Sequence, residues 1–155
     1  MKKMPDSVAQ FLSGRHIAVA GVSRQGRHVG NSIYRKLRDA GYQVYPINPK
    51  ADEVEGVQCF PELAAVPEQI DGLVVATHPD VSVELVRQCR ENGVGRVWFH
   101  RSFGDGSVST DAVRECESAG LQCLVGGCPL MFCEPVDFGH KCMRWWLQRK
   151  GRVPR

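Results

Sequence analysis

The region that most constrains the fold is residues 16–49, where an apolar run, a glycine-rich loop, an amphipathic segment and a second apolar run follow one another. The first run reads HIAVAG, and the loop after it reads GVSRQGRHVGNS. Apolar side chains then recur at helical spacing, at Ile33, Tyr34, Leu37 and Ala40. The region therefore predicts a strand, a loop, a helix and a second strand that ends in YPINPK.

The same alternation continues along the chain. Short apolar runs at residues 72–77, 94–99 and 121–125 predict three further strands. Asp80 is expected to cap the helix between the first two of these strands. Ser109 or Thr110 is expected to begin the helix between the last two.

Strands that alternate with helices predict an α/β fold with a single Rossmann-like, doubly wound parallel sheet of about five strands and helices on both faces. Right-handed crossovers favour the strand order 3-2-1-4-5. At 155 residues the chain suits one domain. We expect residues 1–140 to form it, with a short N-terminal lead-in helix, and residues 141–155 to form a basic C-terminal helix or tail.

Charge is distributed unevenly along the chain. Residues 141–155 hold six Lys or Arg and no acid, whereas the other 140 residues hold 14 bases and 17 acids. We expect the tail to pack on the sheet or on a second subunit, although a basic amphipathic helix could also touch a membrane or nucleic acid. The favoured partners are a small-molecule nucleotide and either a second copy or a partner protein, with no membrane and no nucleic acid.

Seven cysteines without a secretion signal indicate reduced thiols and a cytoplasmic location. Four of them lie with His140 in a C-x4-C-x4-C-x6-H-x-C pattern. This pattern leaves a Cys-based redox or metal protein open as an alternative, with Cys128 and Cys133 as the loop thiols. Zinc sites usually have tighter C-x2-C pairs, so no metal ligand is assigned.

The loop after the first strand is the candidate anion site. Backbone N–H groups and the positive end of the helix dipole attract phosphate at such a position. Gly21 would allow a sharp turn, and Gly30 would allow the start of the helix to approach a phosphate closely. Hydrogen-bond donors and positive charge in the same loop are offered by Ser23, Arg24, Arg27, His28, Asn31 and Ser32.

The end of the second strand distinguishes one nucleotide from another. A nicotinamide-dinucleotide site usually has an acid there to hold the ribose hydroxyls, but this chain has Asn48, Pro49 and Lys50. A lysine suits a nucleotide with an additional phosphate. NADP, with Lys50 and Arg24 on its 2′-phosphate, is therefore an alternative ligand, and the chain would then be an oxidoreductase.

Further polar residues follow the other predicted strands at the same edge of the sheet. Thr77, His78 and Pro79 follow the third strand, and His100 and Arg101 follow the fourth. Ligands of parallel sheets bind at this edge, where the direction of the crossovers changes.

The chain resembles the small, single-domain CoA-binding proteins, whose Rossmann-like domain also forms the N-terminal part of the succinyl-CoA synthetase alpha subunit. The resemblance covers about residues 14–125, and the motifs that carry it are GVS, YPINPK, GVQCFPEL and DGLVV. The chain departs from the family at THPD after the third strand and in its long C-terminal extension.

The resemblance implies a protein that binds coenzyme A or acyl-CoA through the ADP moiety, with Lys50 facing the phosphates, and we expect this protein to be non-catalytic. No catalytic constellation is evident in the sequence. The complete set of expected cofactor-binding residues is Gly21, Val22, Ser23, Arg24, Arg27, His28, Gly30, Asn31, Ser32, Asn48, Pro49, Lys50, Thr77, His78, Pro79, His100 and Arg101.

Overall fold

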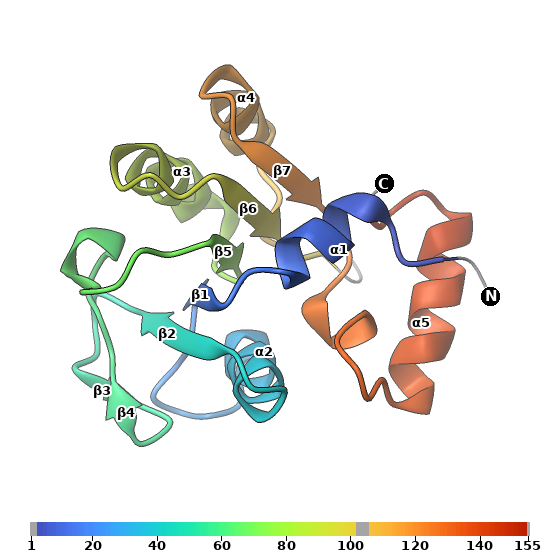
Figure 1. Ribbon diagram of the computed structural model, residues 1–155, viewed down its shortest axis with the longest axis horizontal. Helices are drawn as coiled ribbons and strands as arrows, with labels where there is room; N and C mark the ends of the chain where they lie inside the picture. The colour runs from blue at the N-terminus through green and yellow to red at the C-terminus, as the bar shows by residue number, and fades with distance from the viewer. Residues whose placement is uncertain (1–2, 102–105, 155) are drawn as a thin grey trace.

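The computed structural model describes residues 3–101 and 106–154. Its centre is a five-stranded sheet in which every neighbouring pair is parallel (Figure 1). The five predicted strands are all present, as β1 (His16–Ala20), β2 (Gln43–Ile47), β5 (Gly72–Val75), β6 (Arg96–Phe99) and β7 (Gln122–Val125). The predicted α/β, Rossmann-like fold class is confirmed.

The predicted order of the strands is wrong. The sheet runs β2-β1-β5-β6-β7, so the third main strand lies between the first and the fourth, an order of 2-1-3-4-5. All four residues of β5 are buried, which suits the interior of a sheet, whereas β2 is half-exposed and contains Pro46. Proline cannot donate to a ladder and is therefore typical of an edge strand such as β2.

The connection from β2 to β5 explains this order. Instead of a full helix it holds a two-stranded hairpin, β3 (Glu53–Val54) and β4 (Val57–Gln58), and the short 3-10 helix η1 (Leu63–Ala65). Leu63 belongs to the same buried cluster as Val86 of α3 (Ser82–Glu91), so the connection crosses β1 on the α3 face of the sheet. A right-handed crossover that moves toward β6 must use this face.

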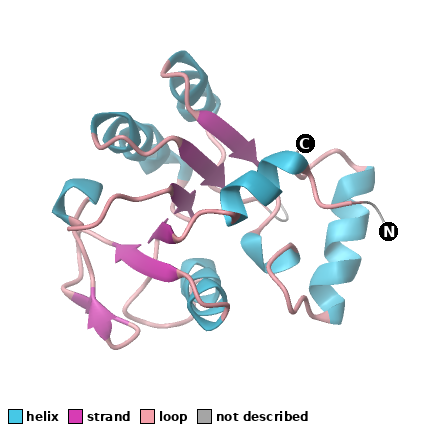
Figure 2. Cartoon of the chain, viewed as in Figure 1, coloured by secondary structure: helices cyan, strands magenta, loops and turns pink. Residues whose placement is uncertain are grey.

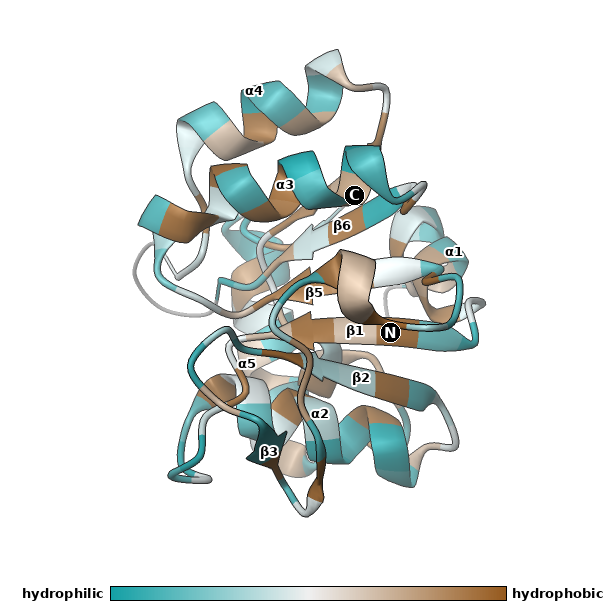
Figure 3. Ribbon diagram, turned by 90° about the vertical axis from the view of Figure 1, so that its left-hand side faces the viewer, coloured by the Kyte–Doolittle hydropathy of each residue, from teal (hydrophilic) through white to brown (hydrophobic). Residues whose placement is uncertain are grey.

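Helices cover both faces of the sheet (Figure 2). One buried cluster joins the sheet to α1 (Asp6–Leu12) and α2 (Val29–Asp39), and the other joins it to α3 and α4 (Thr110–Ser118). In Figure 3, α3 and α4 lie at the β6 end of the sheet and α2 lies at the β2 end.

The expected lead-in helix is α1, and Trp98 anchors it to the sheet. The Trp98 ring is fully buried and meets Phe11 of α1 edge-to-face, with ring centroids 5.3 Å apart. Its other neighbour is Phe132, at 5.9 Å, which follows the 3-10 helix η3 (Pro129–Met131). Aromatic pairs at these separations add to the free energy that burial supplies.

Of the two predicted helix starts, the one at Ser109 is confirmed and the one at Asp80 is wrong. Ser109 caps α4, because its Oγ accepts the Ala112 N–H at 3.4 Å. Asp80 does not cap α3, since Pro79 begins the 3-10 helix η2 (Pro79–Val81) and Val81 occupies the cap position.

The C-terminal segment forms α5 (Phe138–Arg149), which packs on the domain through one face. Leu147 is fully buried in the same cluster as Phe11 and Trp98. Three large side chains of the same helix are exposed, those of Phe138, Trp145 and Trp146. No helix in the described part of the chain is both long and apolar enough to cross a membrane.

Candidate binding groove

A groove of about 450 Å³ lies at the carboxyl ends of β1, β2 and β5. The strand order places the change of crossover direction between β1 and β5, so the groove is at the switch point of the sheet. The described residues that line it are Gly21, Ser23, His28, Ile47, Asn48, Pro49, Lys50, Thr77, His78 and Val81. Eight of these ten are among the residues expected from the sequence, and Ile47 and Val81 were missed.

Two glycines allow backbone segments near the groove to approach one another closely. A Cβ added at Gly21, whose φ is +98°, would lie 2.4 Å from the Ala76 carbonyl oxygen. A Cβ added at Gly30 would lie 2.3 Å from the Gly21 carbonyl oxygen. The space beside Gly30 is therefore filled by protein backbone, and this glycine lets α2 rest on the end of β1.

Asn31 shapes the loop from behind instead of lining the groove. Its side chain is fully buried. Its Oδ1 accepts the Ser23 N–H at 2.8 Å, and its Nδ2 donates to the Ser23 carbonyl at 2.7 Å. Both polar atoms of Asn31 are therefore engaged within the protein. Val22, also buried, faces the core.

Asn48 joins the loop after β2 to the loop after β1. Its Nδ2 donates to the Val22 carbonyl at 2.9 Å, and its Oδ1 accepts the Lys50 N–H at 2.9 Å. These bonds fix the turn that carries Lys50, whose side chain is exposed at the rim of the groove. An amide that bonds the backbone two residues later is typical of such turns.

Thr77, which lines the groove, carries a buried hydroxyl oxygen. Thr77 Oγ1 is buried and has no hydrogen-bond partner among the described residues. The Thr77 backbone is held in place, because Ser107 Oγ donates to the Thr77 carbonyl at 2.6 Å. A buried polar atom normally finds a partner, and the described residues supply none for this one.

Two histidines, His28 and His100, lie near each other, and His28 lines the groove. His28 lines the groove and precedes α2, whereas His100 is buried at the end of β6. Burial lowers the pKa of His100, and the nearby His28 lowers it further. His100 is therefore held in its neutral form more strongly than an exposed histidine.

The remaining predicted residues surround the groove without lining it. Arg24 and Arg27 are exposed in the loop, and Ser32 is half-buried in the first turn of α2. Pro79 begins η2. The backbone of Arg101 forms an isolated bridge with Gly127, which follows β7.

Sequence reasoning missed the β3–β4 hairpin and the ion pair that it makes. Glu55, at the tip of the hairpin, accepts from Arg35 Nη1 of α2 at 2.7 Å and from Asn31 Nδ2 at 2.7 Å. Part of the signal was present, since Gly56 suits the second central position of a two-residue turn between Val54 and Val57, whereas glutamate is not favoured at the first.

Comparison with known proteins assigns the family. The model of the CoA binding domain family matches residues 15–134 of this chain. The chain belongs to the CoA binding domain family. The expected resemblance to CoA-binding proteins is therefore confirmed for most of the chain.

Two curated relatives illustrate the range of the CoA binding domain family. An ADP-forming acetate–CoA ligase of Methanocaldococcus jannaschii is 32% identical over 92 residues, and the match covers 59% of this chain and 13% of the ligase. The uncharacterized protein YneT of Bacillus subtilis is 33% identical over 114 residues, and the match covers 74% of this chain and 82% of YneT. The match spans 13–21% of the length of four acetate–CoA ligases.

Solved structures share the fold. A hypothetical protein from Pyrococcus horikoshii superposes with a TM-score of 0.73 at 26% identity, over 83% of this chain and 93% of that one. An acetyl-coenzyme A synthetase of Ca. Korarchaeum cryptofilum, solved with phosphate and ADP, superposes with a TM-score of 0.61 at 32% identity, over 70% of this chain and 25% of that one.

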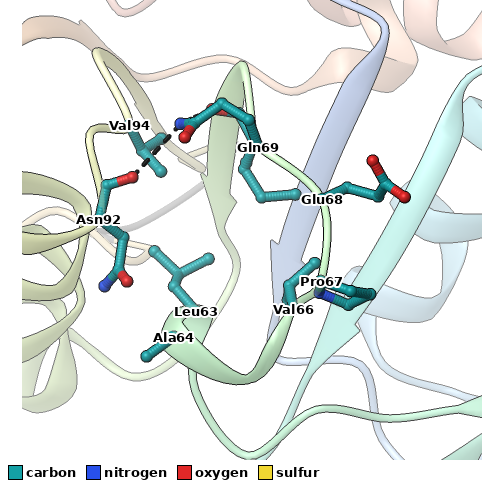
Figure 4. A pocket seen from close by; sticks show the side chains of 9 residues that line it. Leu63, Ala64, Val66, Pro67, Glu68, Gln69, Asn92 and Val94 are labelled. Carbon is teal, nitrogen blue, oxygen red and sulfur yellow. Dashed lines mark hydrogen bonds between the residues drawn. The ribbon is translucent and has the colours of Figure 1, made fainter.

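A second cavity, of about 180 Å³, lies at the opposite edge of this CoA binding domain (Figure 4). It lies between η1 and the segments that lead into β5 and β6, and Gln69 Nε2 donates across it to the Asn92 carbonyl at 3.3 Å. No lysine, arginine or histidine is among the described residues that line it, so it lacks the positive charge that phosphates require.

The cysteines of the C-terminal region do not form a shared site in the described part of the chain. Cys128 and Cys133 are buried, and Cys142 is exposed on α5. Cys116 and Cys123 are joined by a disulfide, so the expectation of reduced thiols is wrong for this pair. Burial raises the pKa of Cys128 to about 12, which does not suit a reactive loop thiol. No cluster of potential metal ligands occurs in the part of the chain that the structure describes.

Proposed function

We propose that this protein is a non-catalytic CoA-binding protein that holds the ADP moiety of CoA or acyl-CoA in the switch-point groove. The observation that carries the proposal is the charge of the groove. Lys50 supplies a positive charge, His28 and His78 supply imidazole nitrogens, and none of its described lining residues is Asp or Glu. An anionic ligand gains from this arrangement, whereas a cationic one does not.

The loop before α2 supports binding of the diphosphate. The N-terminal turn of α2 begins beside the groove, directly after His28, and no side chain caps it. Its N–H groups and the helix dipole favour an anion at this point. Arg24 and Arg27 add positive charge to the same loop.

Lys50 supports CoA in preference to NAD. CoA carries a 3′-phosphate on its ribose, and an ammonium group is a suitable partner for it. NAD requires a carboxylate at this position to accept from the ribose hydroxyls. The ligase activity of the larger relatives is not transferred, because the match spans only 13–21% of their length.

Calorimetric titration with CoA, acetyl-CoA, ADP, NADP and NAD tests the proposal. We expect CoA and acetyl-CoA to bind more tightly than the other three. Lys50→Gln should weaken CoA binding by about 1.5–3 kcal/mol, the range for a hydrogen bond to a charged group. Lys141→Gln, which removes the same charge from α5, is the matched control and should bind as the wild type does. Binding of NADP without binding of CoA would overturn the proposal.

A further inference from the structure

The backbone of Glu55 adopts a left-handed conformation, which glutamate rarely adopts. Its φ is +53°, and Gly56 follows with a φ of +73°, so both central residues of the hairpin turn are left-handed. Val54 pairs with Val57 directly across this turn. Asn, Asp and Gly are favoured at the first central position of such a turn, and glutamate is not. A residue that has an unfavourable backbone conformation is a candidate for a specific role of its side chain.

The Glu55 carboxylate is the meeting point of two donors from α2. Its Oε1 accepts from Asn31 Nδ2 and from Arg35 Nη1, each at 2.7 Å. The Glu55 side chain is 13% exposed, so these bonds are largely shielded from water. Charge-assisted bonds of this length are stronger than bonds between neutral groups.

Both donors also hold the loop that lines the groove. Asn31 bonds both the N–H and the carbonyl of Ser23. Arg35 donates from Nη1 and Nη2 to the Gly26 carbonyl, at 3.3 and 3.4 Å. Glu55 therefore orients the two side chains that fix the loop between Ser23 and Gly26.

We propose that Glu55 is a positioning residue that keeps the loop before α2 in the shape that receives the phosphates of the ligand. This inference rests on the proposed function, and it adds the hairpin to the binding machinery. Preorganised loops bind more tightly because less conformational freedom is lost on binding.

Simple electrostatics predicts the opposite effect, which makes the proposal testable. A carboxylate near an anion site repels the ligand, and its removal would free the charge of Arg35. Removal of Glu55 would then strengthen the binding of CoA. If Glu55 positions the loop, its removal weakens binding even though the net charge of the protein becomes more positive.

The test compares Glu55→Asn with Glu53→Gln. Asparagine is favoured in the turn, so the hairpin should form at least as well, but its shorter, neutral side chain does not reproduce the bonds to Asn31 and Arg35. Glu53 is exposed in the same hairpin, and Glu53→Gln removes the same charge. Calorimetry with CoA and amide hydrogen exchange of the free protein are measured for both variants, together with the melting temperature.

We expect Glu55→Asn to remain folded at the temperature of the titration, which its melting curve checks, and to bind CoA about tenfold more weakly. Its Ser23 N–H, which donates to Asn31, should exchange at least about tenfold faster than in the wild type. Glu53→Gln should leave both quantities unchanged. CoA binding as tight as in the wild type, with Ser23 equally protected, would overturn the proposal.

Failure of the proposed function gives a different result. If the wild type does not bind CoA, the function is wrong, and Ser23 exchange alone then decides the role of Glu55. Faster exchange in Glu55→Asn supports the positioning role, and unchanged exchange contradicts it.

Discussion

Gly30 in the first turn of α2 lies directly against the carbonyl oxygen of Gly21 at the end of β1. A Cβ at residue 30 would be 2.3 Å from that oxygen and 3.1 Å from the Val22 nitrogen. Both neighbours are backbone atoms, so no side-chain rotation can relieve the contact. The loop between these glycines therefore depends on close contact between the helix and the strand.

This contact predicts the effect of Gly30→Ala. Alanine is the better helix former by about 1 kcal/mol, but forcing a methyl group into a close-packed contact costs about 1–3 kcal/mol. Because the new methyl group would lie 2.3 Å from a backbone atom, the steric cost exceeds the gain in helix propensity. We therefore expect a lower free energy of unfolding, together with weaker CoA binding.

Urea unfolding checks this prediction against Gly95→Ala. A Cβ at Gly95 has no neighbour within 4 Å, so this variant should stay within about 0.5 kcal/mol of the wild type. Equal stability of the two variants would show that the Gly30 contact relaxes freely.

His100 predicts a dependence of stability on pH. Burial lowers its pKa in the folded protein below the ordinary value of 6.5, and the neighbouring His28 lowers it further. Between about pH 6.5 and the folded pKa, the unfolded chain therefore binds a proton at His100 more readily than the folded protein does. The contribution of His100 is therefore fully present above about pH 6.5 and is lost as the pH falls through the folded pKa.

Urea midpoints between about pH 7 and pH 5 measure this effect. We expect the wild type to lose stability over this range and His100→Gln to lose less. An identical pH slope in the two proteins would contradict the assignment.

Burial also predicts the order in which the thiols react. It raises the pKa of Cys89 and of Cys128 to about 12, so neither forms a significant amount of thiolate at neutral pH. Cys142 is exposed on α5. Peptide mapping after brief treatment with N-ethylmaleimide should find Cys142 modified and Cys89 and Cys128 unmodified until the protein is denatured. Rapid modification of Cys128 in the native protein would contradict its buried position.

The sequence predicted the strands because interior strands of parallel sheets are continuous apolar runs, as in Gly72–Val75. It did not predict their order, because the segment between Ile47 and Gly72 lacks a full helix to indicate the face on which it crosses. Order is decided by packing, here by Leu63 and Val66 against α3. The error also moved the switch point, which lies between the first and fourth strands in the predicted order and between β1 and β5 in the structure. His100 and Arg101, which follow β6, therefore do not line the groove.

The residues of the site were predicted better than their individual contacts. Asn31 is the kind of side chain that donates to phosphates, and no local pattern reveals that its amide is used by Ser23 and by Glu55, 24 positions away. Lys50 and Thr77 do line the groove, because their positions follow directly from the ends of buried strands. Sequence position thus indicates which edge of the sheet a residue reaches, and long-range packing decides what it contacts there.

Titration of the ¹⁵N-labelled protein with CoA, followed through its backbone amide resonances, tests the central claim most directly. We expect the largest shifts in the loop from Gly21 to His28 and at Thr77 and His78, with the cavity beside Asn92 unaffected. Shifts centred on Leu63 and Asn92, or on α5, with the groove unchanged, would contradict the account.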